Sequence, residues 1–145
     1  MKKEIRTSIE INAPAEKVWE ILTDFENFSS WNPFVTKAKG VPKAGEKIHI
    51  EVQIPGASLQ KFKPEILKAN ENRELRWVGT APVKTFRGEH FFIVEPIGKD
   101  KCRFIHGELF SGWLVRLIWF LQGGKIERGY ELMNKALKEK AEREK

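Results

Sequence analysis

Hydrophobic and polar residues alternate near the start of the chain, over residues 5–14, and three isoleucines, Ile5, Ile9 and Ile11, fall on one side of the alternation. This pattern is typical of a strand with one buried face. From residue 12 to residue 28 the period becomes helical. The apolar stripe that this helix would bury consists of Val18, Ile21, Leu22 and Phe25. Because Pro33 disfavours helical angles in the residue before it, we expect the helix to end between residues 27 and 33.

The middle of the chain has the pattern of an antiparallel meander. Short runs rich in apolar and β-branched residues are separated by Gly, Pro, Asn or charged turns, which is typical of consecutive strands. The six predicted strands are residues 34–40, 46–54, 59–70, 73–80, 86–96 and 101–110. No repeat, linker or low-complexity segment interrupts them, so we expect one domain over residues 1–145.

The last third predicts one long helix with a single buried face. Its apolar residues recur at helical spacing, at Ile126, Tyr130, Met133 and Leu137. A glycine inside a helix costs about 1 kcal/mol relative to alanine, so we expect the pair Gly123-Gly124 to break or hinge this helix. A strand, a short helical segment, six strands and a long terminal helix together indicate an α+β fold.

Aromatic residues are abundant. The 145-residue chain, long enough for one domain with a substantial core, contains ten Phe, five Trp and one Tyr. Large aromatic side chains fill cores, and they also line cavities that receive flat or apolar ligands. Either use is compatible with the composition.

The net charge of +6 comes from basic residues that are spread along the chain and mixed with acids. The densest basic run, residues 135–145, holds five basic and three acidic residues and has the character of a solvated helix end. Because a nucleic-acid site requires a patch of one sign, we expect no nucleic-acid partner. Cys102 is the only cysteine, which excludes an internal disulfide and a cysteine-rich metal motif. The first residues lack the apolar core of a signal peptide, so we expect a cytoplasmic location.

Several segments share the features of a known superfamily. They are "INAPAEKVWEILTDFENFSSWNPF" at the start, "LRWVG", "GEHFFIVEP" and "CRFIHGELFSG" in the middle, and "MNKALKEKAE" at the end. Together they resemble the polyketide cyclase/dehydrase branch of the START-like (SRPBCC, helix-grip) superfamily, whose plant members include the birch pollen allergen. The resemblance implies a curved antiparallel sheet of about seven strands wrapped around the C-terminal helix, with an apolar cavity for a hydrophobic small molecule between them. The superfamily includes lipid carriers, hormone receptors, cyclases and chaperone activators, so the fold does not define one activity.

The resemblance also implies which residues surround the cavity. They are Trp77 from the strand 73–80, His90, Phe92, Phe104, His106, Glu108 and Phe110 from the last hairpin, and Tyr130, Met133 and Leu137 from the terminal helix. We add Trp113 and Leu117 from the apolar segment 113–121, which we expect to be core or a lid over the cavity mouth. At nine residues this segment is too short to span a bilayer, which takes about 20. The alternative for it is an interfacial surface that touches lipid or a partner transiently during ligand exchange.

The register of the last hairpin follows from its turn. If the turn centres on residues 98–99, opposed residues have numbers that sum to about 198, by strand-pairing geometry. The predicted pairs are His90 with Glu108, Phe92 with His106, and Val94 with Phe104. His90 and Glu108 would then lie within hydrogen-bonding reach on one face, with His106 close by.

Three uses of this cluster remain open. A buried carboxylate beside an imidazole can be a structural pair whose polar atoms satisfy one another. It can be a polar anchor that orients a mostly apolar ligand. It can also be catalytic, with His90 or His106 as general acid or base and Glu108 orienting the imidazole.

A metal site is disfavoured, although two histidines and a carboxylate can form a facial iron site. The third histidine, His49, is distant in the sequence, there is no H-E-x-x-H motif, and the iron motifs of ring-hydroxylating relatives are missing. We therefore expect neither a metal nor another cofactor.

The function that the sequence favours is binding of an apolar or aromatic small molecule, such as a lipid, a quinone or a polyketide-like compound. One alternative is an enzyme of the cyclase or dehydratase type that uses the His/Glu pair as acid and base. Another is a protein-interaction module with a vestigial cavity.

Overall fold

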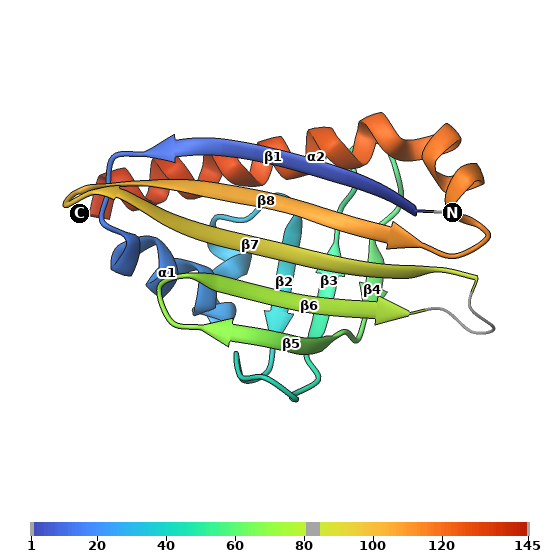
Figure 1. The fold of residues 1–145 in the computed structure, drawn as a ribbon, viewed down its shortest axis with the longest axis horizontal. Coiled ribbons are helices and arrows are strands. Elements are labelled where there is room, and N and C mark those ends of the chain that lie inside the picture. Colours follow the sequence, from blue (N-terminus) through green and yellow to red (C-terminus); the bar gives the residue numbers. More distant parts are fainter. Residues whose placement is uncertain (1, 81–84, 145) are drawn as a thin grey trace.

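A long C-terminal helix packs against a curved antiparallel sheet, and a smaller sheet and a short helix lie beside it (Figure 1). The computed structural model describes residues 2–80 and 85–144. In chain order the elements are β1 (Lys2–Ile11), α1 (Ala15–Thr23), the 3-10 helix η1 (Phe25–Ser30), β2 (Val35–Lys39), β3 (His49–Val52), β4 (Gln60–Phe62), β5 (Glu65–Asn70), β6 (Glu74–Thr80), β7 (Arg87–Gly98), β8 (Lys101–Ser111) and α2 (Val115–Glu144). The limits of the predicted domain, Met1 and Lys145, lie outside the described residues.

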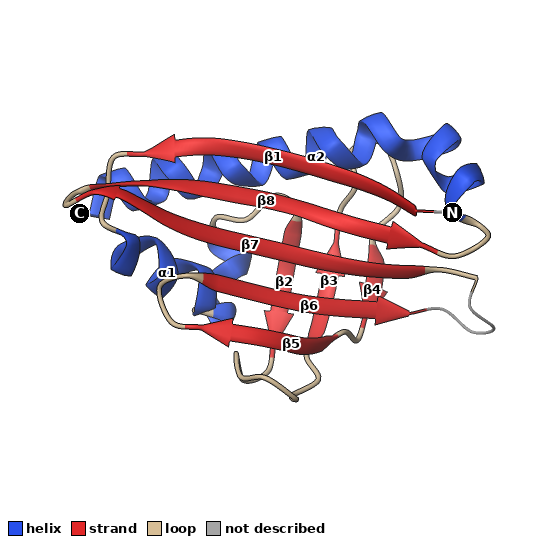
Figure 2. Cartoon of the chain, in the orientation of Figure 1, coloured by secondary structure: helices blue, strands red, loops and turns tan. Residues whose placement is uncertain are grey.

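The described strands form two antiparallel sheets. The larger sheet has the order β1-β8-β7-β6-β5 and the smaller one the order β2-β3-β4. Figure 2 shows the smaller sheet behind the larger, with its strands crossing those of the larger sheet steeply. An isolated bridge between Lys47 and Glu65 joins the segment before β3 to the edge strand β5. The two sheets and α2 thus enclose one interior.

The predicted α+β helix-grip arrangement is confirmed, with one difference in the strands. The segment 59–70, which we predicted as a single strand, forms β4 and β5, and these pair with different sheets. Pro64 lies between them and has no N–H to donate to a ladder. Its carbonyl instead accepts a hydrogen bond from the main-chain N–H of Ile48 at 2.9 Å. The chain therefore changes sheet at the proline, and the described residues contain eight strands rather than about seven.

The first helix buries the predicted apolar stripe but ends earlier than expected. Val18, Ile21 and Leu22 are buried on α1, and Phe25 is buried in η1. At Asp24 the backbone leaves the helical region, with φ −85° and ψ 73°, and the chain continues as a 3-10 helix. The predicted end at residues 27–33 is therefore wrong for the α-helix, although the 3-10 helix η1 that follows it extends to Ser30.

The predicted break at Gly123-Gly124 is wrong, because α2 runs through this pair without interruption. Gly123 is buried, and a Cβ there would touch the indole of Trp119 at 3.5 Å. Farther along, Tyr130, Met133 and Leu137 are fully buried against the sheet. Tertiary packing of a helix face outweighs the unfavourable propensity of two glycines.

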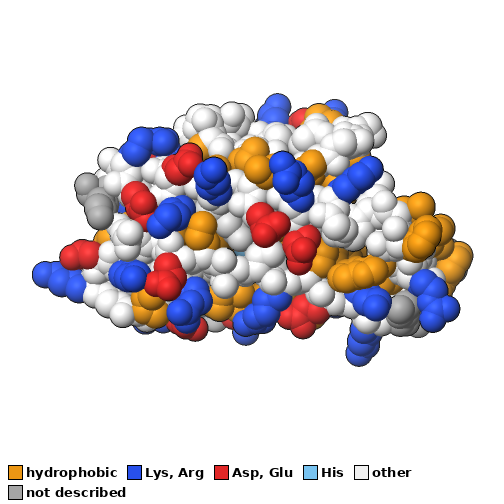
Figure 3. Space-filling view, turned by 90° about the horizontal axis from the view of Figure 1, so that it is seen from above, with side chains coloured by type: hydrophobic (Ala, Val, Ile, Leu, Met, Phe, Trp, Pro, Cys, Tyr) orange, Lys and Arg blue, Asp and Glu red, His pale blue; other side chains and the backbone are white. Residues whose placement is uncertain are grey.

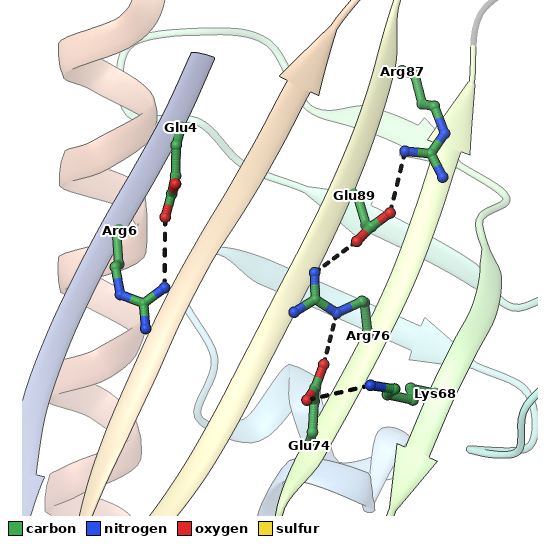
Figure 4. Close-up of polar contacts among 7 residues, drawn as sticks. All are labelled: Glu4, Arg6, Lys68, Glu74, Arg76, Arg87 and Glu89. Atoms are coloured by element: carbon green, nitrogen blue, oxygen red, sulfur yellow. Dashed lines mark hydrogen bonds and ion pairs between the residues drawn. The ribbon is translucent and has the colours of Figure 1, made fainter. Parts of the chain in front are cut away.

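The face of the larger sheet that points away from α2 carries ion pairs (Figure 4). Arg76 donates to Glu74 at 2.7 Å and to Glu89 at 2.6 Å, and Glu89 also pairs with Arg87 at 3.2 Å. The guanidinium of Arg76 lies 4.9 Å from the centre of the Phe91 ring, which it covers. This outer face is therefore polar, and because side chains alternate along each strand, the neighbouring positions point into the interior.

Candidate ligand-binding cavity

A cavity of about 300 Å³ lies between the two sheets and α2. From the larger sheet and the start of its strands it is lined by Trp77, Gly79, Thr80, Phe86, Gly88, His90, Glu108 and Phe110. From the smaller sheet and its flanks it is lined by Phe34, Val35, Ile50, Val52, Ile54, Gln60, Phe62 and Pro64. From α2 it is lined by Ile118, Gln122, Ile126 and Tyr130. The volume is at the lower end of the range found for small-molecule sites, and the lining is mostly apolar, as in such sites.

The β7–β8 hairpin has the register that its turn predicted. The observed partners are His90 with Glu108, Phe92 with His106, and Val94 with Phe104. The side chains of His90, Phe92, Phe104, His106 and Phe110 are buried, and that of Glu108 is 16% exposed. The predicted register is therefore confirmed, and it places these side chains on the same face of the hairpin.

One wall of the cavity is polar. Nδ1 of His90 lies 3.2 Å from Oε1 of Glu108, and the hydroxyl of Tyr130 donates to the same carboxylate oxygen. The indole of Trp77 stacks on the His90 ring with 5.6 Å between ring centres, and Phe34 stacks on it at 6.2 Å. A carboxylate, an imidazole and a phenol thus converge on one point of an otherwise apolar surface.

The polar groups continue behind this wall. Nε2 of His90 lies 2.7 Å from Nε2 of His106, whose Nδ1 lies 2.9 Å from Oδ1 of Asn134. The amide nitrogen of Asn134 donates to the hydroxyl oxygen of Thr7 at 2.8 Å. A continuous chain of hydrogen bonds therefore connects the cavity wall on β7 and β8 with α2 and β1.

Burial keeps two of these polar side chains, His106 and Tyr130, uncharged. It lowers the pKa of His106 well below its usual value, the nearby His90 lowers that pKa further, and the hydrogen bond to Asn134 opposes the change. Burial also raises the pKa of Tyr130 well above its usual value, and the charge of Glu108 adds to this effect. At neutral pH His106 is therefore a neutral imidazole and Tyr130 a neutral phenol.

Local backbone features hold Phe34 against the cavity. Oδ1 of Asn32 accepts hydrogen bonds from the main-chain N–H groups of Phe34 at 3.0 Å and Val35 at 2.9 Å. Such a side-chain bond replaces a backbone turn and is typical of asparagine. On α2, Gly129 leaves room for the ring, because a Cβ there would lie 2.7 Å from Phe34. Both residues serve to seat one aromatic side chain between the smaller sheet and the helix.

The residues predicted around the cavity fall into three groups. Those that line it are Trp77, His90, Glu108, Phe110 and Tyr130. Those that are fully buried behind the lining are Phe92, Phe104, His106, Met133 and Leu137. Trp113 and Leu117, by contrast, are 67% and 55% exposed and are not among the residues that line the cavity. Only the residues of the first group could touch a ligand in the cavity without a rearrangement, and such a contact stays a prediction.

The sequence interpretation missed the wall formed by the smaller sheet. Ile50 and Val52 on β3 line the cavity, as do Ile54 after it and Phe62 on β4. The alternation of Ile48, Ile50, Val52 and Ile54 was the available signal, since it predicts one buried face. It does not reveal what that face is buried against.

The apolar segment 113–121 has two different sides in the structure. Ile118 lines the cavity, whereas large apolar side chains on the other side are exposed. We call this exposed group the apolar end of α2; it comprises Leu117, Phe120 and Leu121 of the helix together with Trp113, which lies just before it. Figure 3 shows hydrophobic side chains gathered at one end of the molecule, with Lys and Arg beside them. Large exposed apolar patches mark interaction sites more often than chance.

Metal sites and membrane-spanning helices are two further features that residues 2–80 and 85–144 could contain. No three of their His, Cys, Asp or Glu side chains are arranged so that they could hold a metal ion. Among the helices of this part of the chain, none is both long and apolar enough to cross a bilayer.

Comparisons with known proteins give a family and a set of similar folds. A family model described as "Polyketide cyclase / dehydrase and lipid transport" matches residues 2–142. A comparison with curated protein sequences gives no significant match.

Among solved structures, the Zhui aromatase/cyclase from Streptomyces sp. R1128 is similar with a TM-score of 0.82 at 13% identity, over 99% of this chain and 95% of that one. A START superfamily protein from Mycobacterium smegmatis gives 0.75 at 20% identity, over 98% of this chain and 99% of the other. Norcoclaurine synthase from Thalictrum flavum, in complex with dopamine and hydroxybenzaldehyde, gives 0.76 at 14% identity, over 100% and 89%. At these identities the solved structures establish a shared fold.

Proposed function

The chain belongs to the polyketide cyclase/dehydrase and lipid transport family, and on this basis we propose that it binds an apolar or aromatic small molecule in the cavity between the two sheets and α2. The observation that carries the proposal is the cavity itself, a space of about 300 Å³ in an interior that could have been filled by side chains. Lipids, quinones and polyketide-like compounds are the ligand classes that fit its chemistry.

The distribution of polar groups supports a ligand with one polar edge. Trp77, Phe34 and Phe110 offer flat apolar surfaces, and burying such surface against a ligand contributes about 25 cal/mol for each Å² removed from water. The polar atoms of His90 and Glu108 lie at one wall. A carbonyl or hydroxyl group on the ligand would satisfy them and fix its orientation.

Ligand extraction and a matched pair of variants test this proposal. Purified protein is analysed by native mass spectrometry and solvent extraction, and the ligand-free protein is titrated with 1,4-naphthoquinone while the fluorescence of the tryptophans is followed. Val52→Phe adds bulk inside the cavity lining, whereas Val41→Phe makes the same change at a residue that is 56% exposed. We expect Val52→Phe to weaken binding at least about tenfold, which corresponds to 1.4 kcal/mol, and Val41→Phe to leave it unchanged. Equal affinities in the two variants, with both folded, would refute the cavity as the binding site.

An enzyme of the cyclase or dehydratase type is the second candidate, and the convergence of His90, Glu108 and Tyr130 on one wall favours it. General acid–base catalysis needs a proton donor or acceptor within hydrogen-bonding reach of the reacting group. Similar folds include an aromatase/cyclase and a synthase solved with two aromatic compounds. For an enzyme, Glu108→Gln removes turnover while naphthoquinone still binds; for a carrier, the same change weakens binding only modestly. A protein-interaction module with a vestigial cavity predicts no bound ligand in any of these measurements.

A transient contact with an anionic lipid surface is also part of the proposal. The apolar end of α2 offers side chains for insertion. Between Leu109 and Ile126 the sequence contains the basic residues Arg116 and Lys125 and no acidic residue. Apolar side chains bordered by cations suit the boundary between anionic headgroups and acyl chains. Because Ile118 and Gln122 of the same segment line the cavity, a contact there would lie beside the ligand. A reducing, cytoplasmic setting fits the single cysteine of the sequence.

A further inference from the structure

The hydrogen-bond chain behind the cavity has a fixed direction, and it starts from a main-chain carbonyl. The hydroxyl of Thr7 donates to the carbonyl oxygen of His106 at 2.8 Å. A carbonyl can only accept, so the single hydroxyl proton of Thr7 is committed to it. The oxygen of Thr7 must therefore accept from its other partner, which is the amide nitrogen of Asn134 at 2.8 Å. This requirement orients the Asn134 amide, with its oxygen toward the ring of His106.

The orientation of Asn134 determines the tautomer of His106. Nδ1 of His106 lies 2.9 Å from Oδ1 of Asn134, and an amide oxygen only accepts, so the hydrogen of the neutral ring is on Nδ1. A hydrogen bond with the main chain of Tyr130 also acts on this ring. Because the ring is fully buried and neutral, its Nε2 carries a lone pair and no hydrogen.

The tautomer of His106 then determines that of His90. The two Nε2 atoms are 2.7 Å apart, and two lone pairs at that distance would repel each other, so Nε2 of His90 carries the hydrogen. The remaining nitrogen, Nδ1 of His90, faces Oε1 of Glu108 at 3.2 Å. One hydrogen must again lie between them, either on the carboxyl oxygen or on the imidazole.

We infer that Thr7 and Asn134 are positioning residues that act through His106 to hold one shared proton between His90 Nδ1 and Glu108 Oε1 at the cavity wall. The titratable groups that face His90 are Glu108 and His106 from β8 and Tyr130 from α2. Tyr130 donates to Glu108 and so does not compete for the shared proton. If the hydrogen bonds ran in the opposite direction, Nε2 of His90 would accept from His106, and the neutral His90 ring would donate its Nδ1 hydrogen to an ionised Glu108, with no additional proton between them.

The shared proton determines which functional group on a ligand the site prefers. This step rests on the proposed function, binding of a small molecule in the cavity. A ketone or quinone carbonyl at this wall would accept a hydrogen bond from the pair. Full transfer would form an O–H bond with a carbonyl lone pair, and the electrons of the broken bond would stay on the carboxylate or on Nδ1. An aliphatic ligand without an acceptor would gain no hydrogen bond at this wall, because the shared hydrogen would stay between His90 and Glu108. The site therefore selects carbonyl-bearing ligands over hydrocarbons of the same shape.

The test is the ring-nitrogen NMR spectrum of ligand-free protein labelled with ¹⁵N-histidine. In the unaltered protein we expect His106 as the single Nδ1–H tautomer and a hydrogen on Nε2 of His90. Thr7→Val keeps the shape of the side chain and removes the hydroxyl, so the Asn134 amide can turn over and the single tautomer of His106 is lost. Thr7→Ser retains the hydroxyl and should restore the original spectrum. Ser8→Ala, on the exposed side of β1, is the control on the same strand.

Two results would overturn the inference, one from the unaltered protein and one from the Thr7→Val variant. His106 observed as the Nε2–H tautomer, or a Thr7→Val protein that is folded and retains the original ring-nitrogen signals, would contradict it. Because no ligand is present, either result leaves the naphthoquinone titration unaffected, and a failed titration leaves the tautomers measurable. The two proposals can therefore fail separately.

Discussion

Gly88 on β7 leaves open the space that the carboxylate of Glu108 on β8 occupies, since a Cβ at residue 88 would overlap Oε2 of Glu108. The carboxylate can therefore turn toward His90 and Tyr130 only because the neighbouring strand lacks a side chain at this point. Directly across the ladder from Gly88 lies Gly79 on β6, which also lines the cavity but where a Cβ would meet nothing within 4 Å. The two glycines form a matched pair for experiment.

Gly88→Ala should displace the Glu108 carboxylate and destabilise the protein. Loss of the hydrogen bonds to His90 and Tyr130 in a buried setting costs about 1–3 kcal/mol of unfolding free energy. Gly79→Ala should change the stability by no more than about 0.5 kcal/mol. Urea unfolding of both variants measures the difference. Equal stabilities would show that the carboxylate can be accommodated elsewhere without loss.

Cys102 should be unreactive in the folded protein. Burial raises the pKa of its thiol to about 11, and the charge of Glu16 contributes to the same change. Since only the thiolate reacts, the raised pKa lowers the reactive fraction roughly a hundredfold relative to an ordinary thiol, and burial restricts access further. The rate of modification by 5,5′-dithiobis(2-nitrobenzoate) at pH 8 should rise at least about a hundredfold in denaturant. Rapid modification of the native protein would contradict this assignment.

The parts of the site that the sequence predicted depend on local rules. The pairing of His90 with Glu108 follows from a tight turn and from the two-residue period of strands, and both act within one hairpin. The burial of Tyr130, Met133 and Leu137 likewise follows from helical spacing. Local periodicity therefore sufficed to place the polar pair on the inner face.

The parts that were missed depend on contacts between distant segments. Thr7 and Asn134 are 127 residues apart, and neither belongs to a motif that would mark it. The change of sheet at Pro64 depends on which strands β4 and β5 pair with. The continuity of α2 through its glycines depends on packing of the helix against the sheet. Tertiary contacts decide these features, and a single sequence does not contain a local signal for them.

The apolar end of α2 should bind anionic vesicles. Replacing Phe120 and Leu121 together by Ser removes two side chains that are 85% and 59% exposed, so it should affect membrane binding more than folding. We expect at least an about tenfold lower affinity for phosphatidylcholine vesicles containing phosphatidylglycerol, measured by co-sedimentation. Added salt should weaken binding of the unaltered protein, because Arg116 and Lys125 act through screened charge. Replacing the exposed Val41 and Ile97 by Ser is the control, and equal loss in both double variants would contradict a specific surface.

The stability of the protein should fall on acidification below about pH 6.5, and His106 should account for part of the fall. Its folded-state pKa is depressed, mainly by burial, so between that pKa and the ordinary value near 6.5 the unfolded chain binds a proton that the folded chain does not. The stabilisation is therefore fully present above pH 6.5 and is lost as the pH falls toward the folded-state pKa, with a slope of up to about 1.4 kcal/mol per pH unit.

Urea unfolding between pH 5 and 7.5 measures this slope, and two histidine variants assign it. His106→Gln removes the titrating group, so the slope should become shallower whatever its effect on absolute stability. His49→Gln alters an exposed histidine on β3 and should leave the slope unchanged. If His106→Gln unfolds, the ring-nitrogen signals of the unaltered protein give the same answer, because His106 should stay neutral at a pH where a free histidine is charged. A slope that is identical in all three proteins, or a His106 ring that takes up its proton near pH 6.5, would show that burial does not keep this ring neutral, and the direction of the hydrogen-bond chain would lose its physical basis.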